Sequence, residues 1–425
     1  MSPTFASLSI RNYRIYALGA IVSNVGTWMG RVGQDWVVLT ELTDHSASAL
    51  GIVTGLQFVP MLLLAPWTGA VTDRYPKRVL LLVTQAVLGL TALLGGLLVL
   101  TGTAELWHFY GLALMTGIAT AFDNPARQTF VSEMVPRERL ANAVALNSAS
   151  FNLGRLIGPA VAGVMIAAIG TGPTLVVNAA TFAAVMVALL MMRAGELSPA
   201  PRVTGRGSAL DGLRYVRGRP DIVLVLIFVL GTFGMNFQIT IALMATRVFG
   251  RGAEDYGLLG SIMAVGSLSA ALLAARRGTP RLRVLLLSLV GFTVAAGAAA
   301  LAPTYWTFAA ALAACGLTAL TTMTTANAMV QTRVAPEMRG RVMALYMAIF
   351  FGGTPLGAPI IGWVGDVLGA RWTIGVGAVA VGITLVVVSF WLARHENVEV
   401  SYSSQRRPRV QVSAAPTHDM PQAAR

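Results

Sequence analysis

The chain has 425 residues, of which 55% are apolar and 12% charged, and its formal net charge is +13. Folded as soluble domains, this composition would expose a large apolar surface to water, so it excludes a soluble protein and predicts one that lies in a bilayer. The single cysteine, Cys315, excludes an intramolecular disulfide, and no cysteine or histidine spacing is typical of a metal site.

Long apolar runs follow one another along the whole chain. A helix that crosses a bilayer needs about 20 mostly apolar residues. Twelve runs of this kind can be placed, at 14–40, 49–72, 79–100, 106–126, 141–169, 173–192, 222–248, 256–275, 284–302, 305–328, 342–367 and 372–393. Runs of this length favour helices over the short alternating strands of a barrel. The sequence therefore predicts an all-α polytopic membrane protein with twelve transmembrane helices.

A polar break at 193–220, rich in arginine, proline and glycine, divides the runs into six and six. The two halves also resemble each other, because Val135-Pro136 and Gly158-Pro159 have counterparts 200 positions later. We expect two six-helix bundles. The predicted divisions are an N-terminal segment (1–13), a first bundle (14–193), a linker (194–220), a second bundle (221–393) and a tail (394–425).

The linker and the tail differ in pattern. In the linker, Ser208 and Asp211 form a capping-box pattern, and Leu210, Leu213 and Val216 share one helical face. A short amphipathic helix at the membrane surface is expected there. The tail after residue 394 is rich in arginine, proline, serine and glutamine and has little to bury, so we expect it to be disordered.

Basic residues predict the orientation in the membrane, because positively charged loops stay in the cytoplasm. If the N-terminus is inside, nearly all lysines and arginines fall in cytoplasmic segments. The five exceptions are Arg31 and Arg155 within runs, and Arg247, Arg251 and Arg371 in outside loops. Residues 1–10 lack the basic start of a cleavable signal peptide. We expect both termini to be cytoplasmic and the positive charge to face anionic lipid rather than nucleic acid.

Polar residues inside the membrane concentrate in the first run of each consecutive triplet. They are Asn24, Thr27, Arg31 and Asp35 in the first run, Thr116, Thr120 and Asp123 in the fourth, Thr232, Asn236 and Thr240 in the seventh, and Thr318, Thr322 and Thr325 in the tenth. Polar groups in a membrane face protein or water. These four helices are therefore expected around a central cavity that Trp28, Phe122, Tyr346 and methionines could line. Helix–helix packing through threonine is the alternative.

Arg31 and Asp35 lie four residues apart in the first run. One reading is a mutual ion pair that neutralises both charges. The other is that Asp35 exchanges protons with each side of the membrane in turn. Arg155, which shares a helical face with Asn152, either pairs with Asp35 or Asp123 or presents a cation to an anionic substrate.

Asp123 and Arg127 repeat the spacing of four at the end of the fourth run. A gate, a helix-end cap and a second proton site remain open for this pair. In the fifth run, Gly154, Gly158 and Gly163 with Pro159 predict a close helix approach combined with a proline kink.

The segment from Gly69 to Arg78 is a charged turn between two apolar runs. Its residues Gly69, Asp73, Arg74, Lys77 and Arg78 resemble the loop signature of the major facilitator superfamily, although Pro76 stands where that pattern has glycine. The resemblance implies two six-helix bundles and secondary transport. It also implies that this loop latches the bundles at the cytoplasmic face, with Asp73 as a lock.

A narrower resemblance is to the branch of bacterial efflux proteins that includes the enterobactin exporter. It rests on Trp28, Gln34-Asp35-Trp36, Leu50-Gly51, Gln57, Pro60, Pro125 and Gly158-Pro159. Gly154 and Gly158-Pro159 are also similar to the fifth-helix motif of antiporters in the superfamily, which favours export. This resemblance implies the inner membrane of a bacterium.

The sequence thus predicts a proton-coupled exporter of a small organic molecule or drug that works by alternating access, as a monomer and without a cofactor. A siderophore or metabolite exporter and a proton-coupled importer are the neighbouring alternatives, and a non-transporting membrane sensor is one of another class. No nucleotide-binding Gly-x-x-x-x-Gly-Lys pattern and no cluster of the four histidines occurs. An enzyme, with catalytic residues or a metal site, is therefore not expected.

Overall fold

The computed structural model describes residues 3–198, 214–217, 219, 222–223, 225–227, 236–275, 280–335, 338–395, 398–403 and 409–414. In the first half these form η1 (Pro3–Ser9), α1 (Arg11–Trp36), η2 (Val37–Glu41), α2 (Ala47–Leu63), α3 (Ala65–Arg74), α4 (Lys77–Leu100), α5 (Leu106–Met134), α6 (Arg137–Ile169), α7 (Thr171–Met191) and η3 (Ala194–Glu196). In the second half they form α10 (Phe237–Leu243), η5 (Met244–Val248), α11 (Ala253–Ala275), α12 (Leu282–Ala300), α13 (Tyr305–Arg333), α14 (Arg339–Val367), α15 (Trp372–His395), β1 (Val398–Ser403) and β2 (Arg409–Ala414).

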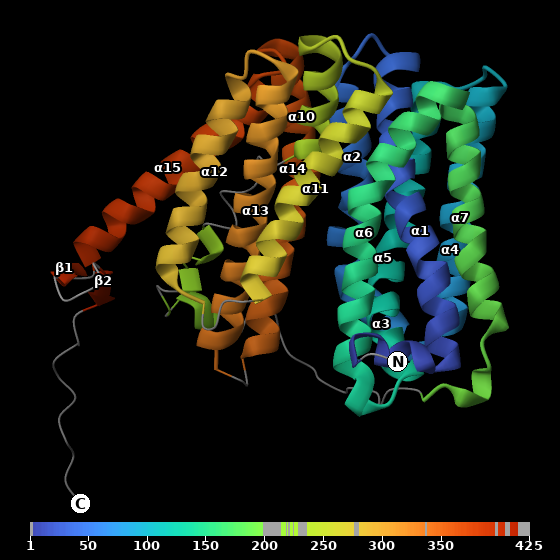
Figure 1. Ribbon diagram of the computed structural model, residues 1–425, viewed down its shortest axis with the longest axis horizontal. Coiled ribbons are helices and arrows are strands. Elements are labelled where there is room, and N and C mark those ends of the chain that lie inside the picture. The colour runs from blue at the N-terminus through green and yellow to red at the C-terminus, as the bar shows by residue number, and fades with distance from the viewer. Residues whose placement is uncertain are drawn as a thin grey trace, which may run out of the picture.

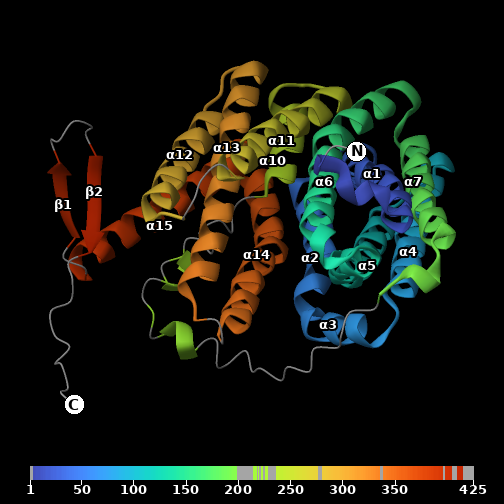
Figure 2. The same cartoon turned by 60° about the horizontal axis from the view of Figure 1, so that its bottom comes forward.

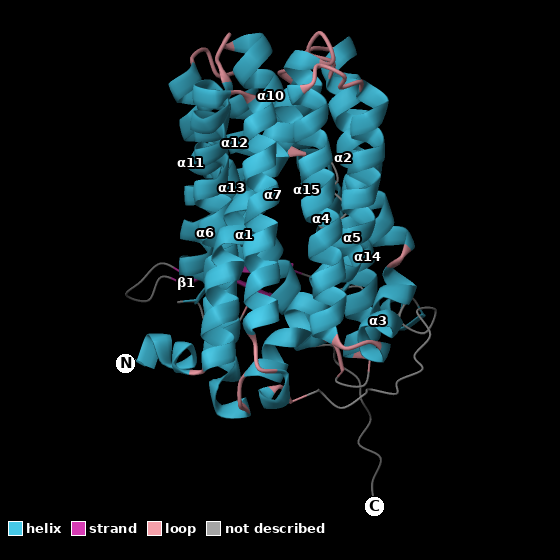
Figure 3. Cartoon of the chain, turned by 90° about the vertical axis from the view of Figure 1, so that its right-hand side faces the viewer, coloured by secondary structure: helices cyan, strands magenta, loops and turns pink. Residues whose placement is uncertain are grey.

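The helices run side by side in two bundles, one from each half of the chain (Figure 1), and the loops gather at the two ends (Figure 3). We call the end that carries the N-terminus and α3 the terminal face, and the opposite end the distal face. In the first bundle α1 packs on α6 and α7, and α4 packs on α5 and α7. In the second bundle α13 packs on α11 and α12, and α12 packs on α15 (Figure 2).

Among the described residues, seven helices are long and apolar enough to cross a membrane, and the bent pair of α2 and α3 makes eight. Two further apolar stretches are shorter, Phe237–Val248 in α10 with η5 and Trp372–Val387 within α15. The predicted all-α polytopic fold is confirmed. The count of twelve is not confirmed in full, because the seventh run is only partly described and α1 and α5, which carry more polar residues, do not meet the same criterion.

The second predicted run breaks into two helices that meet at an angle of 66°. Pro60 lies inside α2, and a proline stands in the first turn of α3. Proline cannot donate a helical hydrogen bond and clashes with the preceding turn, which explains the bend. The bend carries α3 sideways along the terminal face.

In the described part of each half of the chain, a π-helical turn lies at the distal end of the first helix. In η2 the Leu42 N–H donates to the Val37 carbonyl at 3.0 Å, and in η5 the Phe249 N–H donates to the Met244 carbonyl at the same distance. A wider bond then closes each turn, from His45 to Leu39 and from Arg251 to Ala245, both at 2.8 Å. The two halves of the chain thus share this piece of local backbone geometry.

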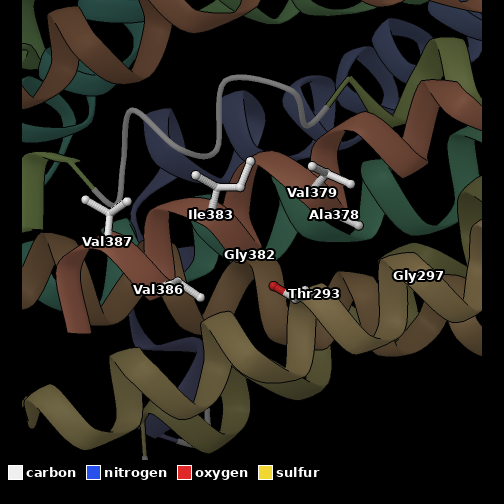
Figure 4. Close-up of a pocket in the computed structure, with 8 residues that line it drawn as sticks. All are labelled: Thr293, Gly297, Ala378, Val379, Gly382, Ile383, Val386 and Val387. Atoms are coloured by element: carbon white, nitrogen blue, oxygen red, sulfur yellow. The ribbon is translucent and has the colours of Figure 1, made fainter. Parts of the chain in front are cut away.

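The helices at the outside of the molecule expose large aliphatic side chains. Leu287 and Val294 of α12 and Ile383 and Val386 of α15 are more than half exposed. Between these two helices lies a groove of about 510 Å³ lined by Thr293, Gly297, Ala378, Val379, Gly382, Ile383, Val386 and Val387 (Figure 4). An apolar outer surface of this kind is what a bilayer covers.

In the tail, where the sequence predicts disorder, the structure pairs β1 with β2 in an antiparallel ladder from Val398–Ala414 to Ser403–Arg409. The segments VEVSYS and RVQVSA alternate between valine or tyrosine and polar residues, which is a strand pattern that composition alone does not reveal. Residues 404–408 and 415–425 of the tail lie outside the described part.

Most of the amphipathic helix predicted in the linker also lies outside the described residues, including Ser208 and Asp211. Residues 214–217 are helical, and the Tyr215 hydroxyl accepts from the Ala335 N–H at 3.3 Å. Arg219 donates to the carbonyl of Arg333 at 3.2 Å. This piece of the linker is thus fixed to the end of α13, and the predicted domain boundaries stay predictions.

Candidate functional site

The two bundles meet through α2 against α14 and through α6 against α11. The approach is close enough to require glycine. A Cβ added at Gly51 would lie 2.5 Å from the Ala358 carbonyl oxygen, and one added at Gly257 would lie 2.1 Å from that of Pro159. Both contacts lie in the distal half of the helices, so the pathway between the bundles is closed toward the distal face.

The glycine contact between the bundles nearer the terminal face is looser, because a Cβ added at Gly352 would lie 3.5 Å from the Leu62 side chain. The α2–α14 contact reaches Leu62 opposite Gly352, and α3 beyond it packs on α5 of its own bundle. Asp73 and Arg74 at the end of α3 are exposed, and within the described part of the chain neither side chain has a hydrogen-bond or ion-pair partner. Among the described residues, Asp73 and Arg74 of the loop that the resemblance identifies as a latch therefore make no polar contact with the opposite bundle in this conformation.

Asp35 lies where the closed half of the interface begins. Its carboxylate is 5% exposed, and its Oδ2 accepts a hydrogen bond of 2.8 Å from the Tyr256 hydroxyl. Asp35 is on α1 and Tyr256 is on α11, so the bond joins the two bundles. Trp36 stacks on the same tyrosine, with ring centroids 6.3 Å apart.

Two arginines share one aromatic ring beside Asp35. The Arg31 guanidinium lies 4.9 Å and the Arg155 guanidinium 5.7 Å from the ring centroid of Trp28, and Arg31 also lies 5.5 Å from the ring of Phe58. No ion pair within 4 Å joins either arginine to Asp35 or Asp123 among the described residues. The two cations are therefore held by ring faces rather than by carboxylates.

Two buried donors lie on the same segment of α1. The Trp28 Nε1 and the Gln34 Nε2 have no acceptor in the described part of the protein, although Gln34 Oε1 accepts from Gln57 at 3.0 Å. Buried polar groups are nearly always hydrogen-bonded. Two cations and two unused donors make this segment suited to an anionic group.

The three candidate asparagines have different surroundings. Asn24 on α1 donates to the Ser150 hydroxyl on α6 at 2.9 Å. Asn152 donates to the Ser148 carbonyl of its own helix, also at 2.9 Å. Asn236 is buried just before α10, a helix that touches both α1 and α2. Of the three, Asn24 is the one that the structure ties to a neighbouring helix through its side chain.

Asp123 is as buried as Asp35, at 4% exposed, but it is surrounded by donors of its own bundle. Its Oδ1 accepts from Thr84 and from Gln85, both at 2.7 Å, and its Oδ2 forms an ion pair with Arg127 at 3.1 Å. All three donors lie on α4 or α5. This arrangement favours a structural tie between those helices.

The glycines of the fifth-run motif face two partners. Added Cβ atoms would lie 2.7 Å from the Asn24 carbonyl carbon at Gly154 and 2.8 Å from the Val25 carbonyl oxygen at Gly158, both on α1. At Gly163 the contact is 2.5 Å from the Ala253 carbonyl oxygen on α11, where Gly257 also meets Pro159. α6 therefore packs closely on its own bundle with one part of the motif and on the opposite bundle with the other.

The basic residues of the charged loop bind their own bundle. Lys77 is buried and forms an ion pair with Glu133 at 2.6 Å. Arg78 donates to the Leu189 carbonyl at 2.7 Å and to the Leu190 carbonyl at 3.0 Å, where α7 ends. Gly69 faces open space. These arginine and lysine contacts fix α4 to α5 and α7, while Asp73 stays outside them.

A pocket of about 460 Å³ lies between α13 and α14. It is lined by Met323, Thr324, Asn327, Ala328, Gln331, Thr332, Tyr346 and Met347. Of the three aromatic residues predicted to line a central cavity, this pocket includes Tyr346, together with two methionines and the amides Asn327 and Gln331, but neither Trp28 nor Phe122. The sequence predicts that the threonines of the tenth run line a cavity or pack between helices. Thr318 donates to the backbone of its own helix, and Thr322 donates to the Ser288 hydroxyl of α12, which is helix packing.

Sequence reasoning missed several partners at the site. Tyr256 begins the eighth run, and nothing near it in the sequence indicates that it reaches Asp35. Gln85 and Asn178 lie in the otherwise mostly apolar third and sixth runs, and both are buried, Gln85 at Asp123 and Asn178 against Gly30 of α1. A lone amide in an otherwise apolar run was the available signal, because such a group needs a partner inside the protein. Among the described residues, no cluster of three metal-ligating side chains occurs.

Comparison with known proteins agrees with this architecture. A family model described as transmembrane secretion effector matches residues 2–420. The staphyloferrin A transporter of Staphylococcus aureus is 30% identical over 253 residues, which cover 58% of this chain and 63% of that protein, less than two thirds of its length. The enterobactin exporter EntS of Shigella boydii is 25% identical over 389 residues, covering 90% of this chain and 92% of that protein.

Solved structures show the same fold at low sequence identity. A bacterial homologue of the human lysosomal transporter Spinster, inward-facing and occupied, superposes with a TM-score of 0.68 at 16% identity, over 93% of this chain and 98% of that one. The nucleoside transporter NupG gives a TM-score of 0.67 at 13% identity, over 90% of this chain and 98% of that one.

Proposed function

Because the chain belongs to the transmembrane secretion effector family of the major facilitator superfamily, and is thus a multi-pass membrane transporter and not an enzyme, we propose that it is a proton-coupled exporter of a small organic molecule. In this proposal the two bundles alternate between opening to one side and to the other, and Asp35 carries the proton. Substrate and protons are its partners, with lipid around it, and a single chain contains the whole pathway.

The observation that carries the proposal is the hydrogen bond of 2.8 Å from Tyr256 to Asp35 across the interface. A buried carboxylate with a single donor is costly in its charged form, whereas a protonated one is not. Separating the bundles at the distal face breaks this bond and admits water to Asp35. The change of conformation therefore changes the environment of the carboxyl group, which is what coupling requires.

The proposed orientation in the membrane follows from the charge distribution. Basic residues gather at the terminal face, which the positive-inside rule makes cytoplasmic together with both termini. The conformation described above is then closed to the outside. The close α6 contacts at Gly158 and Gly163 and the similarity to an exporter support export from a bacterial inner membrane rather than import.

A second candidate is narrower: the exported molecule is a siderophore or another organic anion. The two guanidiniums on Trp28 favour it, because neither has a carboxylate within 4 Å among the described residues. Arginine binds carboxylates and phenolates through fixed donor geometry. The molecules for which two relatives are named, staphyloferrin A and enterobactin, are siderophores.

The test is proton movement in proteoliposomes with an imposed pH gradient. Enterobactin, staphyloferrin A, other organic anions and lipophilic cations are added in turn to the wild type, to Asp35→Asn and to Asp123→Asn. We expect one or more compounds to trigger proton flux in the wild type and in folded Asp123→Asn, but not in Asp35→Asn, which should still bind the compound. The siderophore candidate predicts a response to the anions alone.

Proton flux that survives in Asp35→Asn would show that Asp35 is not the coupling residue and that proton coupling occurs at another residue. A wild type that moves substrate only down its own gradient, with no proton, contradicts coupling. No movement of any compound supports the sensor. Accumulation inside right-side-out vesicles, driven by an inward proton gradient, supports the importer.

A further inference from the structure

Asp366, the second-last residue of α14, holds the first turn of α2 in the opposite bundle. Its Oδ1 accepts from the Ala47 N–H at 2.9 Å, and its Oδ2 accepts from the Ser48 N–H at 2.8 Å and from the Ser46 hydroxyl at 3.3 Å. Arg247 of η5 donates to the same Oδ1 at 3.1 Å. One carboxylate thus connects α2, α14 and η5 at the distal face.

The contact replaces part of a helix cap. The first N–H groups of a helix have no partner inside it and carry partial positive charge. In α2 the Ser46 side chain takes one of them, accepting from the Ala49 N–H at 3.2 Å. The N–H groups of Ala47 and Ser48 remain, and both point to Asp366. Because a carboxylate is a stronger acceptor than a hydroxyl, the opposite bundle supplies the stronger part of the cap.

Close backbone packing fixes the position of this carboxylate. A Cβ added at Gly362 would lie 2.4 Å from the Ala47 carbonyl oxygen, and one added at Gly365 would lie 2.9 Å from the Ala47 side chain. The start of α2 therefore rests directly on the turn of α14 that carries Asp366. The carboxylate can keep its bonds only while the two bundles touch at the distal face.

We propose that Asp366 is the distal gate latch, which stabilises the conformation closed at the distal face and must release α2 each time the pathway opens there. The inference rests on the alternating access of the proposed function. When the latch opens, water replaces the Asp366 carboxylate as the acceptor for the N–H groups of Ala47 and Ser48. Opening therefore has an energetic cost that binding of the substrate or the proton must offset. Asp73 at the terminal face, which has no partner in the described part of this conformation, is left free while Asp366 is engaged.

The test measures the distance between the bundles at the distal face in the full-length protein. Asp44→Cys in the first bundle and Gly252→Cys in the second, in a Cys315→Ala background, carry spin labels in lipid nanodiscs. Both sites are exposed, and a side chain added at Gly252 meets open space. Pulsed electron resonance then gives the populations of the short, distal-closed distance and the long, distal-open distance.

Asp366→Asn keeps the shape but removes the charge and turns one acceptor oxygen into a donor that faces an N–H. We expect the ratio of closed to open populations to fall by about tenfold or more. Arg247→Gln should shift it in the same direction by less, because the backbone bonds remain. The matched control is Asp255→Asn. This residue lies at the same face with a side chain 25% exposed, against 27% for Asp366, but its ion pair is with Arg251 of its own bundle.

Unchanged populations in Asp366→Asn and Arg247→Gln would overturn the latch, as would an equal shift in Asp255→Asn. The readout needs no substrate, so it separates this inference from the proposed function. A shifted population in a protein that moves no proton leaves the latch intact and contradicts the coupling. An unshifted population in a protein with normal proton flux contradicts the latch and leaves the proposed coupling intact.

Discussion

Two buried aspartates, Asp35 and Asp123, share almost every local property but differ in the origin of their donors. Each lies on a polar first helix of a triplet, each has an arginine four residues away, and they are 5% and 4% exposed. Among the described residues, Asp123 has three donors, all from its own bundle, whereas Asp35 has one, from the other bundle. Burial alone therefore does not separate a structural carboxylate from one that responds to bundle movement. The two kinds of carboxylate are separated instead by whether the donor comes from the same bundle or from the opposite one.

The largest expected difference is in proton coupling. Asp35→Asn removes the exchangeable proton at the interface, so substrate-triggered proton flux in proteoliposomes should fall to the level of protein-free vesicles. Asp123→Asn should retain flux per folded molecule, because the donors Thr84, Gln85 and Arg127 belong to its own bundle and need not separate from it when the bundles move. An equal loss of proton flux in both variants, at equal amounts of folded protein, would show that the two aspartates do not differ in their role in coupling.

The free energy of unfolding should show the opposite order, with the larger decrease in the Asp123 variant. Asp123→Ala leaves the buried Arg127 without its carboxylate, and breaking a buried pair in this way destabilises a protein by about 3 to 5 kcal/mol. Asp35→Ala removes one hydrogen bond and no ion pair, so it should have a much smaller effect. Thermal unfolding of both variants in the same detergent measures the two midpoints, and a lower midpoint for Asp35→Ala would contradict this account.

Tyr256→Phe removes the single donor to Asp35 and keeps the stacking on Trp36. A hydrogen bond between neutral groups contributes about 0.5 to 1.5 kcal/mol, so with Asp35 protonated the distal-closed population should fall about two- to tenfold. The label pair at positions 44 and 252 measures it. Tyr305→Phe is a suitable control, since its hydroxyl bonds the Asp255 carbonyl within one bundle and its loss should leave the distances unchanged.

The smallest effect is expected at the neutral donors of Asp123. Gln85→Leu removes one of its three donors, and a net loss of about 1 kcal/mol is typical of such a bond. The unfolding midpoint should decrease slightly while transport per folded molecule is retained. A loss of proton flux in Gln85→Leu would instead place Asp123 in the coupling pathway.

The sequence identified both aspartates but could not rank them. Polarity within an apolar run and a spacing of four are local properties, whereas Tyr256 lies 221 positions from Asp35. The spacing also suggested an ion pair of Arg31 with Asp35. Side chains four residues apart share a helical face, yet a long arginine chooses among all neighbours on that face. Here it lies over Trp28 and Phe58, which only the packed structure brings together.

The helical fold was easier to predict, because a bilayer forces every spanning segment to satisfy its own backbone hydrogen bonds. Apolar length is therefore nearly sufficient to find α4, α7 and α12. It is insufficient where packing decides the outcome. The run at 49–72 breaks into α2 and α3, and the loop motif that resembles a latch is disengaged from the opposite bundle at Asp73, which depends on the conformation and not on the sequence.

The two π-helical turns, η2 and η5, have a consequence for the ancestry of the chain. Residues Val37–Glu41 and Met244–Val248 share no identical residue in register, yet each contains a π-helical bond, from Leu42 to Val37 and from Phe249 to Met244. Because π-helical turns are rare, inheritance explains the coincidence better than two independent origins. An ancestral half-length gene would already have encoded this turn before it was copied and fused. In that account, the π-helical turn has been retained in both halves, whereas the amino acids that form it have been substituted.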